Sequence, residues 1–141
     1  MKKALGTASI VLASLTLAAC TAAPSLESQL RAAVTAPTAE TLMLSSLDAA
    51  DGESFLVVCP YESKESVDDR LGFSWKHAPD YSKVDDRQTV AVIDNGAVVA
   101  HAEFGRGEVD FCTTDEWAVL PTGTELTVSR TAENVVVTKR Q

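Results

Sequence analysis

The sequence predicts an α+β fold in which one or two short helices come first and a mostly antiparallel, curved sheet of five or six strands follows. Three observations support this prediction. Apolar residues in the first third of the chain recur at helical spacing, short β-prone runs fill the second half, and Asn95-Gly96 separates two of those runs. One helix, over residues 62–71, is expected to pack on the sheet. A small closed barrel is the alternative architecture.

Two helical patterns precede the first expected strand. Ser25 is a typical N-cap, and the apolar residues after it fall on one face of a helix: Leu26, Leu30, Ala33 and Val34. A second helical pattern spans residues 39–50 and ends at Asp51-Gly52. Within it, residues 42–44 equally suit a short strand, because they form a short apolar run.

Residues 54–59 are apolar on both faces, which is typical of a central strand, and Pro60 ends the run. Residues 62–71 predict a helix with Ser63 as its N-cap and Gly72 just beyond its end. Residues 72–88 are polar and show no periodicity. We therefore expect them to form an irregular loop, which is the candidate binding loop of this chain.

Asn95-Gly96 predicts a hairpin of residues 90–94 and 97–101, because both residues tolerate the positive φ of a type I′ turn. Counting outward from the turn pairs Ile93 with Val98 and Val90 with His101. The remaining strands are expected at residues 108–112, 117–120, 124–130 and 134–139, the last two forming a second hairpin.

The N-terminus has a different composition from the rest of the chain. Lys2 and Lys3 precede an uncharged, mostly apolar run that ends in Leu17-Ala18-Ala19-Cys20 and is shorter than the ~20 residues needed to span a bilayer. This segment resembles the signal peptide of bacterial lipoproteins, with its lipobox. The resemblance implies that residues 1–19 form a signal helix that is removed after Ala19, and that Cys20 receives a diacylglyceryl group through its thiol.

Removing residues 1–19 from the 141-residue chain leaves 122 residues, the size of one domain. We expect residues 20–37 to form a tether and a short helix, and residues 38–141 to form a single α+β domain. The lipid on Cys20 would then attach the domain to the extracytoplasmic face of the bacterial cell membrane.

The charge of the chain restricts its partners. The sequence has 12 basic and 20 acidic residues, and loss of Lys2 and Lys3 leaves the mature chain with a formal charge near −10. Such a chain repels nucleic acid and anionic lipid. An acidic, solubilising surface is the simpler interpretation, and a basic protein or a glycan is the expected partner if there is one.

Cys59 and Cys112 remain as an even pair once Cys20 carries lipid, and in an exported protein they are expected to form a disulfide. Val58-Cys59-Pro60 before a predicted helix is superficially similar to the active-site segment of peroxiredoxins, which implies redox chemistry with Cys112 as the resolving cysteine. The match covers three residues and lacks the upstream Pro and Thr of that family. A structural disulfide is the favoured interpretation.

No motif in the sequence indicates catalysis, a metal or a cofactor other than the lipid. We therefore expect a non-enzymatic binding module of the cell envelope, whose partner-binding residues lie in the loop 72–88: Trp75, Tyr81, Asp85 and Asp86. One alternative is an inhibitor of a basic secreted hydrolase such as lysozyme, since membrane-bound lysozyme inhibitors are similar small, disulfide-bonded, strand-rich lipoproteins. The other alternative is a thiol oxidoreductase that uses Cys59 and Cys112.

Overall fold

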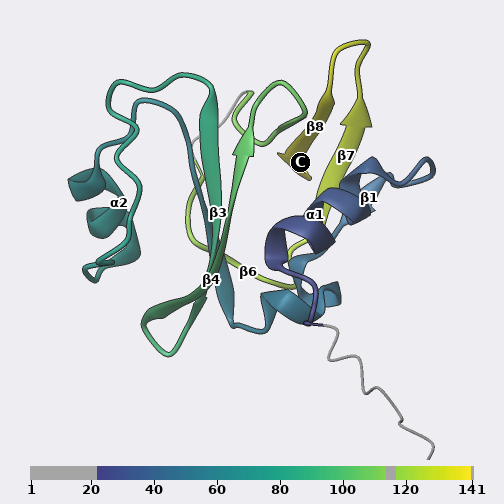
Figure 1. The fold of residues 1–141 in the computed structure, drawn as a ribbon. Coiled ribbons are helices and arrows are strands. Elements are labelled where there is room, and N and C mark those ends of the chain that lie inside the picture. Colours follow the sequence, from purple (N-terminus) through teal and green to yellow (C-terminus); the bar gives the residue numbers. More distant parts are fainter. Residues whose placement is uncertain (1–21, 114–116, 141) are drawn as a thin grey trace, which may run out of the picture.

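The computed structural model describes residues 22–113 and 117–140, and these form an α+β fold with two four-stranded sheets (Figure 1). The strand order is β4-β3-β2-β6 in one sheet and β1-β7-β8-β5 in the other. The pairs are antiparallel except for β5 and β8, which run parallel. The elements are α1 (Leu26–Thr35), β1 (Thr41–Leu42), η1 (Leu44–Ser46), η2 (Asp48–Ala50), β2 (Ser54–Val58), α2 (Lys64–Leu71), β3 (Arg87–Asp94), β4 (Ala97–Gly105), β5 (Val109–Asp110), β6 (Leu120–Pro121), β7 (Leu126–Arg130) and β8 (Val135–Lys139).

The prediction of a single curved sheet of five or six strands is wrong in its sheet count. The last hairpin, β7–β8, pairs with β1 on one side and with β5 on the other, so it builds a second sheet instead of extending the first. Both flanking strands are only two residues long. Strands of that length carry too little pattern to be recognised in the sequence.

Helix α1 contributes directly to the core. The Ser25 side chain accepts a hydrogen bond from the Ser28 amide, which confirms the predicted N-cap. Leu26, Leu30 and Val34 are buried in the same cluster as the strand residues. The helix packs against β1, β4 and β8 and so contacts both sheets (Figure 1).

The predicted helix over residues 39–50 is wrong. This segment forms β1 and the two short 3-10 helices η1 and η2. Leu42 and Leu44 are buried whereas Met43 between them is 42% exposed, which is the period-two pattern of a strand. Pairing with β7, together with the bond from the Val128 amide to the Glu40 carbonyl, outweighs the helical preference of the segment.

Strand β2 is the central strand that its apolar sequence predicts, and it lies between β3 and β6. Helix α2 follows it and begins at Lys64, two residues later than predicted. The Ser63 side chain accepts from the Ser66 amide, and Gly72 adopts φ +76°, so both predicted capping residues are confirmed.

The Asn95-Gly96 turn joins β3 to β4 with φ values of +48° and +73°, as predicted. Ile93 pairs with Val98, but the predicted pairing of Val90 with His101 is wrong, because Val90 pairs with Ala102. A β-bulge beyond Ile93 inserts one extra residue into β4 and shifts the register. A shift of one residue exchanges the two faces of a strand, so Ala102 is buried and His101 is exposed.

Candidate functional site

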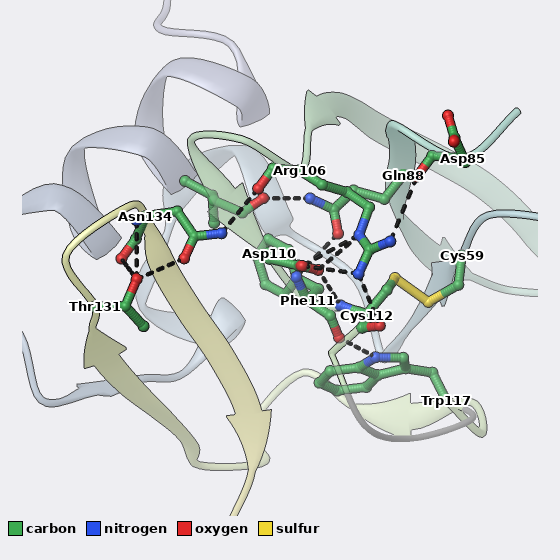
Figure 2. Close-up of polar contacts among 11 residues, drawn as sticks. Cys59, Asp85, Gln88, Arg106, Asp110, Phe111, Cys112, Trp117, Thr131 and Asn134 are labelled. Atoms are coloured by element: carbon green, nitrogen blue, oxygen red, sulfur yellow. Dashed lines mark hydrogen bonds and ion pairs between the residues drawn. A yellow bond between two sulfur atoms is a disulfide. The ribbon is translucent and has the colours of Figure 1, made fainter.

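The predicted disulfide joins Cys59, at the end of β2, to Cys112, just after β5, with their Cα atoms 5.7 Å apart (Figure 2). This bond confirms the pairing expected from the cysteine count. It fixes the end of the molecule where β2 ends, β3 begins and β4 turns into β5. We call this region the disulfide end, and the opposite region around Asn95-Gly96 the base.

Arg106 and Asp110 hold the chain between β4 and β5 at the disulfide end. The Arg106 Nε lies 3.1 Å from both Asp110 carboxylate oxygens, and its Nη2 lies 2.9 Å from Oδ2 (Figure 2). The Cys112 amide donates to Asp110 Oδ1 at 2.7 Å, and the Cys112 carbonyl accepts from Arg106. Hydrogen bonds from Arg106 to Asp110 raise the pKa of Arg106, and the two side chains together orient the backbone at Cys112.

The side chain of Gln88 joins the two sheets beside this ion pair. Gln88 is fully buried in β3, donates through Nε2 to the Val109 carbonyl, and accepts from the Phe111 amide at 2.9 Å. The buried indole of Trp117 donates to the Phe111 carbonyl at 2.7 Å. These bonds satisfy backbone groups of the β5 segment that have no strand neighbour on the β3 side. The arrangement is a structural support for the disulfide end.

Trp75 and Tyr81, the predicted aromatic anchors, are both buried, at 7% and 5% exposure. The Trp75 amide donates to Asp68, and its ring contacts the imidazole of His101 at 5.4 Å between centroids. The Tyr81 hydroxyl lies 2.8 Å from both Thr89 Oγ1 and Glu103 Oε2, and burial raises the pKa of Tyr81 to about 12. The predicted loop 72–88 is two residues too long, because Arg87 and Gln88 belong to β3. The Trp75 and Tyr81 side chains attach this loop to the sheet. They do not project from it as exposed anchors.

Tyr61 is the exposed aromatic residue of the disulfide end, and the sequence analysis missed it. Its side chain is 68% exposed, and its backbone has φ +65°, a region that bulky residues rarely adopt. The Tyr61 amide donates to the carbonyls of Tyr81 and Val84, at 3.0 and 3.3 Å, which holds this conformation against the loop 72–88. The sequence could have indicated this exposure, because Tyr61 lies in the connecting segment between Pro60 and the N-cap of α2, and such segments run over the surface.

Asp85 and Asp86 directly follow Val84, whose carbonyl accepts from the Tyr61 amide. Both are exposed, as the sequence analysis requires of partner-binding carboxylates. Their carbonyls accept from Arg106, through Nη1 for Asp85 and through the amide for Asp86. Asp86 also lies 4.0 Å from Arg87, whose guanidinium pairs with Glu103. We call Tyr61, Asp85 and Asp86 the Tyr61 surface.

The described residues contain no group of three or more His, Cys, Asp or Glu side chains that could hold a metal ion. Within residues 22–113 and 117–140, no helix is long and apolar enough to cross a membrane. Cys20, the predicted lipid site, lies outside the described residues. Comparison of the chain with protein-family models, with curated proteins and with solved structures finds no match.

Proposed function

We propose that this protein is a lipid-anchored lipoprotein of the bacterial cell envelope, and that its domain is a non-enzymatic module that binds a basic protein partner through the Tyr61 surface. The lipobox that ends at Cys20 supports the anchor, and the Cys59–Cys112 disulfide is consistent with an oxidising, extracytoplasmic location. The observation that carries the binding role is the exposed Tyr61 ring, whose strained backbone conformation is held by two hydrogen bonds.

The chemistry of the Tyr61 surface suits a cationic side chain of a partner protein. An exposed tyrosine ring attracts a guanidinium or ammonium group, and a carboxylate beside it accepts charged hydrogen bonds. The Arg106 guanidinium forms its ion pair with Asp110 and bonds Asp85 only through the carbonyl, although the Asp85 charge also acts on it. Among the described residues, the Asp85 carboxylate has no ion-pair partner within 4.0 Å.

Inhibition of a basic secreted hydrolase such as lysozyme is a particular case of this proposal. The formal charge near −10 of the mature chain favours this case, because it attracts a basic protein electrostatically and speeds their association. A lysozyme activity assay with the purified protein tests this case directly.

The geometry lends less support to a thiol oxidoreductase. Helix α2 begins at Lys64, so Cys59 does not sit at its N-terminus, and the Cys59 amide donates to the Glu62 carboxylate at 2.8 Å. Cys59 therefore does not have the helix N-terminus that stabilises the thiolate of many reactive cysteines.

The anchor is tested with Cys20→Ser in the native host. We expect loss of labelling by a palmitate analogue and loss of the protein from the membrane fraction, because the thiol is the acceptor of the lipid. Unchanged labelling and fractionation in this variant would contradict the anchor.

The binding surface is tested by comparing Tyr61→Gly with Tyr61→Phe in a pull-down from envelope extracts. Glycine adopts φ +65° without strain, so Tyr61→Gly should fold at least as stably as the parent and lose the partner. Tyr61→Phe keeps the ring and should retain most of the partner. Capture that is equal in both variants, or that is insensitive to added salt, would contradict the proposed surface.

A further inference from the structure

The lipid anchor and the Tyr61 surface lie at opposite ends of the molecule. Helix α1 starts at the base, where Gln29 links the Pro24 carbonyl to the Ala49 amide in η2. Residues 51–53 then lead into β2, and the Glu53 amide bonds the Ile93 carbonyl close to the Asn95-Gly96 turn. The first described residues therefore leave the fold at the base, whereas Tyr61 follows the far end of β2 (Figure 1).

The length of the strands gives the separation of the two ends. Strand β3 runs from Arg87 at the disulfide end to Asp94 at the base. Its eight residues extend roughly 23 Å at about 3.3 Å per step. Strand β4 returns from Ala97 to Gly105 over a similar distance. The Tyr61 surface therefore lies one strand length away from the point where the tether enters the fold.

The segment between the lipid and α1 is short. From Cys20 to Ser25 the chain advances five residues, which span at most about 18 Å even when fully extended. This distance is smaller than the length of β3. The segment thus holds the base near the bilayer and leaves the disulfide end farther out.

The base does not attract an anionic bilayer, because its exposed side chains include Asp48, Asp51 and Glu53. The same argument applies to the Tyr61 surface, whose carboxylates repel anionic headgroups. The anchored domain is therefore held by its tether at the base, and no part of the Tyr61 surface favours contact with its own membrane.

We infer that the anchored domain presents the Tyr61 surface away from its own bilayer, so that the partner is a cationic protein segment that approaches from the aqueous side and not a lipid headgroup. This inference rests on the proposed anchor at Cys20 and on the proposed binding surface. It adds the direction of approach and excludes the supporting membrane as the ligand.

The orientation is tested with a fluorescent amino acid placed at Ala97, at the base, or at Gly107, at the disulfide end. Both positions are exposed, and a Cβ at Gly107 meets no atom within 4 Å. The full lipidated chains are reconstituted into phosphatidylglycerol–phosphatidylethanolamine vesicles that carry nitroxide-labelled headgroups. We expect several-fold stronger quenching at position 97 than at position 107.

The outcomes separate this inference from the proposals on which it rests. Lipidated protein that floats with the vesicles but is quenched equally at both positions, or more at 107, would overturn the orientation and leave the anchor intact. Failure of the full chain to float, with behaviour matching Cys20→Ser, would overturn the anchor itself. Addition of a basic peptide, polyarginine, should protect Tyr61 from chemical iodination on the vesicle-bound protein. Protection by phosphatidylglycerol vesicles in place of the peptide would overturn the choice of partner.

Discussion

Substitution of Gln88 tests how the two sheets are joined. Gln88→Met keeps the length and approximate volume of the side chain but removes both of its hydrogen bonds, to the Val109 carbonyl and from the Phe111 amide. Each of the two buried backbone groups left without a partner costs about 1–3 kcal/mol, so the expected loss in the free energy of unfolding is about 2–6 kcal/mol. In a domain of this size that loss lowers Tm by roughly 10 °C or more.

The matched variant Gln88→Glu makes the same test dependent on pH. Burial raises the pKa of the introduced carboxyl in the folded state above its unfolded value of about 4.3. The neutral acid donates to Val109 and accepts from Phe111, so its bonds stabilise the fold at pH values below about 4.3. That stability is lost as the pH rises through the folded pKa, because a buried, ionised carboxylate then faces the Val109 carbonyl.

Urea unfolding followed by tryptophan fluorescence measures these differences, with the parent protein at each pH as the reference. Hydrogen exchange at the Phe111 amide gives a local readout, which should become much faster in Gln88→Met. A loss below about 0.5 kcal/mol in Gln88→Met would refute the role of Gln88, since this is the range of an ordinary surface substitution. Gln88→Glu that matches the parent at every pH would refute it equally.

Three further predictions concern the disulfide, the end of α1 and the buried tyrosine. Mass spectrometry should show Cys59 linked to Cys112, and Cys112→Ala should lower the free energy of unfolding by about 2–5 kcal/mol. Two free, fast-alkylating thiols in freshly isolated protein would instead favour the redox alternative. Arg130 donates to the carbonyls of Val34, Ala36 and Ala39 at and just after the C-terminus of α1. Arg130→Ala should therefore destabilise the protein by about 1–3 kcal/mol, and Arg130→Lys by less. Equal stability of the parent and both variants would contradict the capping role. Because the folded pKa of Tyr81 is raised to about 12, its phenol contributes stability that is fully present below pH 10 and is lost as the pH rises from 10 toward 12; an ultraviolet titration should lose its late phenolate transition in Tyr81→Phe.

The features that the sequence determined by itself depend on a few neighbouring residues or on the cysteine count. Ser25 and Ser63 cap their helices because the bond runs to an amide three residues away, and Asn95-Gly96 turns because its own φ values decide the geometry. The disulfide followed from the even number of cysteines left after Cys20. The lipid on Cys20 stays a prediction, because that residue lies outside the described part of the chain.

Tertiary structure decided the features that depend on distant partners. Residues 39–50 do not form the predicted helix, because β1 within this segment pairs with β7. The two strands lie more than eighty residues apart in the chain. The separation into two sheets likewise depends on how strands from both halves of the chain meet.

The candidate site divides in the same way. The loop 72–88 was predicted as the candidate binding segment from its lack of periodicity, and its Asp85 and Asp86 are exposed. Which aromatic side chain accompanies them was decided by packing, because Tyr81 finds a buried partner in Thr89 whereas the carbonyls of Tyr81 and Val84 hold Tyr61 outward. Composition locates an aromatic residue near a loop, but only the contacts made by the folded chain determine whether its ring fills the core or faces water.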